Sequence, residues 1–143
     1  MQQPLGRVVT RKVLIADDEP NIVAAIEFLL KQRGYDVYTA ADGAEALRTV
    51  ERVVPDLVVL DVMMPQTSGY EVCQSIRRRA EWRHIKVLML SAKGRDAEVV
   101  RGVAMGADLY VTKPFSTREL MARIDGLLGT ASETANAPPS NRT

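Results

Sequence analysis

The sequence has very few of the residues from which disulfides and histidine-rich metal sites are built. It contains one cysteine, Cys73, and one histidine, His84. A single cysteine excludes an internal disulfide and is typical of proteins that work in a reducing compartment. A single histidine excludes a metal site made mainly of imidazole ligands.

The chain also lacks a long apolar run and an excess of charge of either sign. No stretch approaches the ~18 consecutive apolar residues of a membrane-spanning helix, and the N-terminal MQQPLGRVVTRK has no apolar core of a secretion signal. Nineteen basic and eighteen acidic side chains give a formal charge of +1, which favours neither a nucleic-acid nor an acidic partner. We therefore expect a cytoplasmic protein that neither enters a membrane nor binds nucleic acid directly.

What the sequence does contain is a regular alternation of two hydrophobic patterns. Runs rich in Val, Leu, Ile and Tyr predict five strands, at residues 13–16, 36–40, 56–60, 86–90 and 108–112. Several of these runs are almost continuously apolar, which is typical of strands buried on both faces. Strands that alternate with helices indicate an α/β fold, in which a five-stranded parallel sheet carries helices on both faces.

Helical patterns fill the gaps between these runs. Pro20 suits the first turn of a helix that ends near Gly34, and Gly129 suits the stop of the last helix. Further helix starts are predicted by capping boxes at Asp42–Glu45, Ser68–Glu71 and Ser116–Glu119. The fourth helix, over about residues 94–105, is predicted to be the weakest because glycines lie in or beside it.

The length of 143 residues favours a single domain. We expect an N-terminal extension over residues 1–11, the folded domain over 12–128 and a disordered tail or linker over 129–143. The last segment is small, polar and contains proline, so it has no apolar side chains from which to build a core.

Polar side chains follow four of the five predicted strands: Asp17 and Asp18, Asp61, Ser91, and Lys113. In open α/β sheets, ligands bind beyond the carboxyl ends of the strands, where the strand order reverses. Several carboxylates with one hydroxyl and one ammonium suit a divalent cation together with a phosphoryl group. A carboxylate nucleophile can accept such a group as an aspartyl phosphate.

Four motifs closely resemble the receiver domain of two-component response regulators. They are ADDEP (16–20), VLDVMMPQTSGYE (59–71), MLSAK (89–93) and GADLYVTKPF (106–115), which occur in order and after the predicted strands. The resemblance covers about residues 12–128. It implies a flavodoxin-like (βα)5 fold with the strand order 2-1-3-4-5.

The same resemblance implies a role for each strand-end residue. Asp61 is implied to be the phosphoacceptor, and Lys113 to bind the phosphoryl group. Asp18 and Asp61 are implied to bind Mg²⁺ (or Mn²⁺) directly, together with the backbone carbonyl of Met63. Asp17 would act on this metal ion through a bound water.

The resemblance also implies a switch. Ser91 occupies the position of the switch hydroxyl, and Tyr110 that of the aromatic side chain that changes rotamer with it. A cis peptide bond is implied between Lys113 and Pro114. Phosphorylation would thereby alter the surface formed by the fourth helix, the fifth strand and the fifth helix.

Two positions that tune phosphoryl lifetime in this family are Met63 and Lys93 in this sequence. The thioether of Met63 cannot hydrogen-bond an attacking water as an Asn or Asp could, so we hypothesise slow self-dephosphorylation. Glu19, beside Pro20, is expected at a helix N-terminus, where negative charge is favourable. We expect Glu19 to have little part in Mg²⁺ binding.

The implied function is a signalling switch rather than a turnover enzyme. Its partners would be a sensor histidine kinase or a histidine phosphotransfer protein, which donates the phosphoryl group, and an output partner that the sequence does not identify. An alternative is the receiver part of a larger DNA-binding transcriptional regulator. The segment 106–124 resembles such regulators, which dimerise through the fourth helix, fifth strand and fifth helix.

Charged residues bear on that homodimer. Asp108, Arg118 and Arg123 are in place for charge pairs between subunits, although Leu109 replaces a frequent acidic residue. Basic side chains also gather around Trp82, and we interpret them as complementing the end of the preceding helix rather than as a docking surface. They are Arg77, Arg78, Arg79, Arg83, His84 and Lys86.

Three other classes of protein compete with the switch. A phosphatase of the haloacid-dehalogenase type uses an Asp nucleophile but needs a second Asp two positions later, where this chain has Met63. A flavodoxin-like cofactor binder needs a hydroxyl- and glycine-rich phosphate loop after the first strand, where this chain has ADDEP. A degenerate receiver that serves only as a binding surface is disfavoured because every chemical position is filled.

Overall fold

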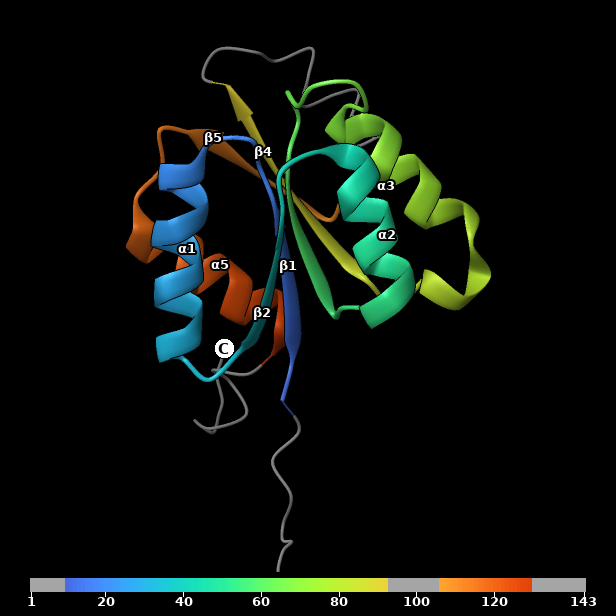
Figure 1. Ribbon diagram of the computed structural model, residues 1–143. Coiled ribbons are helices and arrows are strands. Elements are labelled where there is room, and N and C mark those ends of the chain that lie inside the picture. Colours follow the sequence, from blue (N-terminus) through green and yellow to red (C-terminus); the bar gives the residue numbers. More distant parts are fainter. Residues whose placement is uncertain (1–9, 93–105, 130–143) are drawn as a thin grey trace, which may run out of the picture.

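A computed structural model describes residues 10–92 and 106–129 of the protein. Five parallel strands form one sheet in the order β2-β1-β3-β4-β5 (Figure 1). They are β1 (Lys12–Ala16), β2 (Asp36–Ala40), β3 (Leu57–Asp61), β4 (Lys86–Ala92) and β5 (Leu109–Lys113). The predicted fold class and strand order are confirmed.

Helices cover both faces of the sheet. They are α1 (Pro20–Gln32), α2 (Gly43–Val53), α3 (Gly69–Arg78) with the short 3₁₀ turn η1 (Ala80–Trp82), and α5 (Thr117–Leu128). Figure 1 shows α1 and α5 on one face and α2 and α3 on the other. The predicted fourth helix, the N-terminal extension up to residue 9 and the tail from residue 130 lie outside the described residues.

The sheet divides the hydrophobic core into two layers. Along β3, Leu57 and Val59 pack with α1 and α5, whereas Val58 and Leu60 pack with α2 and α3. Because every residue of β3 is buried, the strand has no solvent-facing positions and reads as a continuous apolar run. Burying one such side chain stabilises the fold by about 1.5–3 kcal/mol.

Side-chain caps start three of the helices as the sequence predicts. Asp42, Ser68 and Ser116 each accept a hydrogen bond from the backbone N–H three residues further on. Of the three predicted capping boxes, the one at α3 is reciprocal, since Glu71 accepts from the backbone N–H of Ser68 at 2.9 Å. At α2, Glu45 accepts instead from the backbone N–H of Ala41. Each cap satisfies backbone donors that the helix itself leaves free and is worth about 1 kcal/mol.

A buried polar contact joins the two helices on one face. Asp125 of α5 accepts hydrogen bonds from the Tyr35 hydroxyl (2.6 Å) and the Arg33 guanidinium (2.9 Å) at the end of α1.

Within the described part of the chain, no helix is both long and apolar enough to cross a membrane.

Candidate functional site

The carboxyl ends of β1, β3 and β5 bring three of the predicted site residues together. Lys113 Nζ lies 3.1 Å from Asp17 Oδ2 and 3.4 Å from Asp61 Oδ2. Both carboxylates are almost completely buried, at 1% and 5% exposure. The strand order places Asp17 and Asp61 at the ends of the neighbouring strands β1 and β3, and the long side chain of Lys113 reaches them from β5, two strands away from β3.

The acidic stretch after β1 is shaped by Asp17. Its Oδ1 accepts a hydrogen bond from the backbone N–H of Glu19 at 2.9 Å, an Asx turn that redirects the chain into α1. Asp18 is exposed, whereas the carboxylate of Glu19 turns back and lies 2.8 Å from Lys113 Nζ.

One acidic group in the described residues could hold a metal ion, and its members differ from those predicted. Asp17, Glu19 and Asp61 each offer a carboxylate oxygen, and these oxygens lie within 4.8 Å of one another. Asp18, implied as a direct ligand, is not in this group. Glu19 begins α1 as predicted, but sequence reasoning missed its contact with Lys113, because the contact depends on the path of the Asx turn.

The environment of Asp61 disfavours its ionised form. Burial and the nearby charge of Asp17 raise the pKa of Asp61 to about 7, while Lys113 and the backbone N–H of Met63 act in the opposite direction. Met63 donates that hydrogen bond to Asp61 Oδ1 at 3.3 Å. Lys113 alone therefore does not balance the negative charge collected at this site.

Lys113 itself stays charged at neutral pH. Burial lowers its pKa, but hydrogen bonding to Glu19 and the charges of Asp61 and Asp17 outweigh that effect and raise the pKa above its ordinary value. Its ammonium group therefore acts as a permanent positive charge between the carboxylates.

Two buried oxygen atoms have no hydrogen-bond partner among the described residues. Asp17 Oδ2 forms the ion pair with Lys113 but no well-aligned hydrogen bond, and Ser91 Oγ at the end of β4 is 1% exposed. The buried Asp17 oxygen without a hydrogen bond, together with the raised pKa of Asp61, fits a divalent oxygen-seeking cation such as Mg²⁺ or Mn²⁺. The Ser91 hydroxyl is free to donate a hydrogen bond to an oxygen-rich ligand.

The remaining predicted residues surround this centre. The Tyr110 hydroxyl of β5 donates to Met89 Sδ at 3.4 Å, and its ring packs against the core layer beneath α2 and α3. The bond between Lys113 and Pro114 is cis. The Met63 side chain is 60% exposed, and Lys93 lies outside the described residues.

Comparison with known proteins identifies the family. Residues 13–125 match the response regulator receiver domain. The chain belongs to this family. Over 120 residues the receiver domain is 46% identical to the alkaline phosphatase synthesis transcriptional regulatory protein PhoP of Bacillus subtilis, an alignment that covers 84% of this chain and 49% of PhoP. The chain thus spans about half the length of that curated relative.

Solved structures agree with this assignment. The receiver domain of the Francisella response regulator 1452 is 34% identical with a TM-score of 0.77, covering 85% of this chain and 99% of that one. The chemotaxis protein CheY4 of Vibrio cholerae is 31% identical with a TM-score of 0.78, covering 83% of this chain and 99% of that one. The expected receiver-domain fold is confirmed.

Gly69 is a site-shaping residue of this receiver domain that sequence reasoning missed. A Cβ atom there would collide with the backbone carbonyl of Asp61. The Gly69 N–H donates to the Val62 carbonyl at 3.0 Å, so the start of α3 lies directly against the end of β3. A larger residue would push the helix away from the Asp61 backbone.

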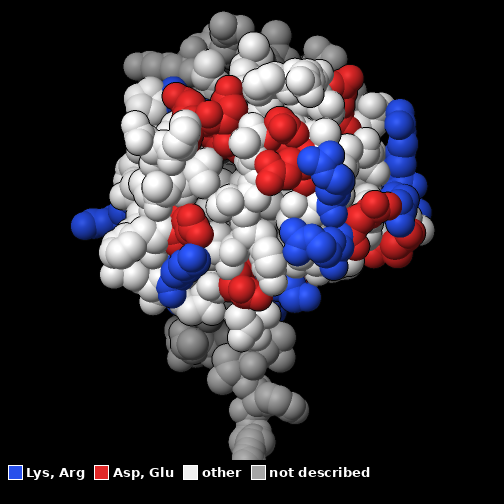
Figure 2. All heavy atoms as spheres, in the orientation of Figure 1, with Lys and Arg blue, Asp and Glu red and all other residues white. Residues whose placement is uncertain are grey.

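Two predicted charge clusters have structural partners inside the receiver domain. Asp108, expected to pair between subunits, accepts from Arg77 and from the backbone N–H of Val87, both at 2.8 Å. Arg79 lies 4.0 Å over the ring of Trp82 and pairs with acidic neighbours. Figure 2 shows basic side chains on the α2–α3 side interleaved with acidic ones.

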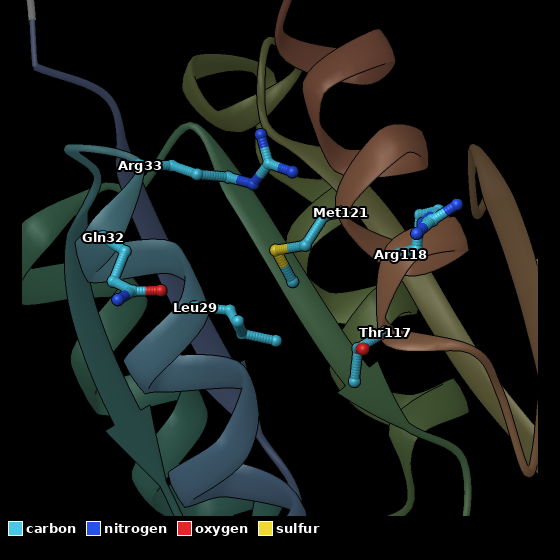
Figure 3. Close-up of a pocket in the computed structure, with 6 residues that line it drawn as sticks. All are labelled: Leu29, Gln32, Arg33, Thr117, Arg118 and Met121. Atoms are coloured by element: carbon cyan, nitrogen blue, oxygen red, sulfur yellow. The ribbon is translucent and has the colours of Figure 1, made fainter.

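The hollow between α1 and α5 lies apart from the strand-end residues. Figure 3 shows Leu29 of α1 and Met121 of α5 pointing into this groove, whose volume is about 340 Å³. None of the strand-end carboxylates, Ser91 or Lys113 lines it. The chemically reactive groups of the receiver domain therefore lie at the carboxyl ends of the strands rather than in this groove.

Proposed function

We propose that this receiver domain is a phosphorylation-controlled switch, in which Asp61 accepts a phosphoryl group from a phosphohistidine. The donor would be a sensor histidine kinase or a histidine phosphotransfer protein. The observation that carries the proposal is the buried Asp61 carboxylate held between Lys113 and Asp17 at the strand ends. In this arrangement Asp61 supplies the nucleophile, and the Lys113 ammonium supplies a positive charge for the phosphoryl group that is transferred.

The transfer balances as a substitution at phosphorus. An Oδ atom of Asp61 forms a bond to phosphorus as the P–N bond of the phosphohistidine breaks, and the electron pair returns to the imidazole nitrogen. Lys113 then contacts a phosphoryl oxygen, and the Ser91 hydroxyl donates to another. Later attack of water on phosphorus releases phosphate and restores the Asp61 carboxylate.

A divalent cation is part of this proposal. By the family resemblance, Asp18, Asp61 and the carbonyl of Met63 would hold it, and Asp17 would act on it through a bound water. When bound, Mg²⁺ or Mn²⁺ neutralises the carboxylates and phosphoryl oxygens and favours the ionised, nucleophilic form of Asp61.

The output is proposed to follow from Ser91. As its hydroxyl moves toward the phosphoryl group, Tyr110 would leave its Met89 contact and fill the space beside β4. The surface of β5 and α5 would then change and meet an output partner. The similarity to a transcriptional regulatory protein supports a second candidate, in which this is the receiver part of a larger DNA-binding regulator.

A turnover phosphatase is the poorer candidate. Such an enzyme needs an acid two residues after the nucleophile to protonate its leaving group. Met63 occupies that position and has no proton to give. A side chain that cannot hydrogen-bond an attacking water as Asn or Asp could supports a covalent state that persists long enough to signal.

The function is tested by labelling with acetyl phosphate. Intact-mass spectrometry should show one added phosphoryl group on the protein with Mg²⁺ present and none when the divalent ions are chelated. Asp61→Asn should abolish the added mass because an amide is not a nucleophile for this transfer. Labelling that is independent of Mg²⁺, or that survives Asp61→Asn, would contradict the proposal.

A further inference from the structure

The shortest contact of Lys113 is with Glu19, a residue that the proposed chemistry does not use. Lys113 Nζ lies 2.8 Å from Glu19 Oε1, compared with 3.1 Å from Asp17 and 3.4 Å from Asp61. The two residues are 94 positions apart in the sequence. This contact therefore joins the start of α1 to the end of β5.

The position of Glu19 is built by its neighbours. Its N–H donates to Asp17 Oδ1, and its carbonyl accepts from the N–H groups of Ile22 and Val23 in the first turn of α1. Glu19 is the N-cap residue of that helix, yet its side chain makes no capping hydrogen bond. The carboxylate is turned toward Lys113 instead.

Three carboxylates surround the ammonium of Lys113, from Asp17, Glu19 and Asp61. Its hydrogen bond among the described residues goes to Glu19 Oε1, whereas the other two carboxylates form ion pairs with it. A phosphoryl oxygen that binds Lys113 therefore competes with Glu19 for an N–H group of the ammonium. Two of the carboxylate side chains are 0% and 7% exposed, whereas that of Glu19 is 57% exposed, so it can return to water most easily.

We propose that Glu19 is a positioning residue that holds Lys113 before phosphorylation and competes with the phosphoryl group for its ammonium. This inference rests on the proposed function. The Glu19 carboxylate occupies the place beside the Lys113 ammonium that a phosphoryl oxygen takes later, and it leaves that place when the phosphoryl group binds. Its removal should make Lys113 more available and tighten the binding of a phosphoryl group.

The test uses beryllofluoride, which mimics a phosphoryl group on an Asp carboxylate. Its affinity for the full chain at saturating Mg²⁺ is measured by fluorine NMR, and Mg²⁺ affinity is measured separately by calorimetry. Glu19→Gln keeps the shape of the side chain and removes its charge. We expect beryllofluoride to bind about two- to fivefold more tightly to this variant.

A matched control lies on the same helix. Glu27 pairs with Lys31 at 2.9 Å, a Glu–Lys contact of similar length that touches none of the site residues. Glu27→Gln removes the same charge and should leave beryllofluoride affinity unchanged. Equal tightening by both substitutions would overturn the inference, because it would reflect net charge alone.

Action through Lys113 is tested by a double-mutant cycle. In a Lys113→Met background Glu19→Gln should no longer tighten beryllofluoride binding, since the ammonium for which Glu19 competes is gone. Tightening that persists in this background would show that Glu19 merely repels the anion, and the inference would be wrong.

Glu19→Asp decides the question if Lys113→Met abolishes binding altogether. Aspartate keeps the charge but has a shorter reach and prefers to cap the helix, so it should tighten binding as Gln does. Affinity equal to that of the unmodified protein would overturn the inference. The absence of Mg²⁺-dependent beryllofluoride uptake by the unmodified protein would instead overturn the proposed function.

Discussion

Asp61 shows how one residue can be costly for the fold and useful for its chemistry. It lies beside Asp17 in a buried position, where like charge and low solvation both disfavour the carboxylate. The folded protein maintains this unfavourable arrangement because surrounding strands position both side chains. The same crowding is what attracts a divalent cation to this place.

The crowding predicts a pH dependence of stability in the absence of divalent ions. The pKa of Asp61 is raised from 3.8 to about 7 in the folded protein, so unfolding becomes easier as the pH rises through that interval. Asp61→Asn cannot ionise and should be more stable than the unmodified protein at pH ~8 by about 1–3 kcal/mol. The two should converge below pH ~3, where Asp61 is neutral in both the folded and the unfolded protein.

Urea unfolding with a chelator present, at several pH values, measures this difference. A difference that stays constant across the pH range would show that Asp61 is not the group responsible. If Asp61→Asn is the less stable protein at high pH, the raised pKa is wrong.

The side chain of Met63 leads us to predict a long lifetime of the phosphorylated state. Met63 is 60% exposed and lies two residues after Asp61, and its thioether cannot hydrogen-bond an attacking water as an amide could. Met63→Asn introduces an amide that can hydrogen-bond water, and we expect several-fold faster loss of the phosphoryl group. The loss of the added mass is followed over time after the phosphodonor is removed, and an unchanged rate would contradict the prediction.

At the scale of elements, the site depends on how closely α3 approaches β3. Gly69 allows this approach because a side chain there would meet the carbonyl of Asp61. The reciprocal capping box of Ser68 and Glu71 begins the helix at the same point. The capping box, which is a local feature, and the close approach of Gly69, which is a tertiary contact, therefore both fix the start of α3 against the backbone of Asp61.

Gly69→Ala should separate the helix from the strand. We expect a loss of about 1–3 kcal/mol in the free energy of unfolding, together with weaker phosphoryl uptake because the Asp61 backbone shifts. Gly126→Ala is the matched control, since it lies within α5 and its Cβ would meet no atom within 4 Å. That change should stabilise the protein by about 0.5–1 kcal/mol and leave uptake unaltered.

At the scale of the whole molecule, one charged residue of the predicted dimer surface is already bound within its own domain. Asp108 ties the start of β5 to Arg77 of α3 and to β4. Arg118 and Arg123 on α5 remain on the surface. A homodimer through β5 and α5 would therefore rely on α5 charges rather than on Asp108.

Light scattering tests this dimer. With Mg²⁺ and beryllofluoride the molar mass should rise toward twice that of the monomer as protein concentration increases, and Arg118→Glu should shift this rise to higher concentration. Arg83→Glu, after η1, is the control and should have no effect. A protein that takes up beryllofluoride fully yet stays monomeric would refute the dimer.

The sequence by itself determined the features that depend on neighbours along the chain. The strands, three helix caps and the polar residue at the carboxyl end of four of the five strands follow from apolar spacing and local backbone hydrogen bonds. The strand order came from the resemblance of four motifs to a family, since periodicity does not state which strands are neighbours.

Tertiary structure alone decided the contacts between distant segments. Glu19 reaches Lys113, Asp108 is held by Arg77, and Gly69 lies against Asp61. The exposure of Asp18 and the Asx turn that Asp17 forms with the N–H of Glu19 are likewise features of the folded chain. Such outcomes depend on backbone paths and side-chain reach across the sheet, which spacing along one chain does not encode.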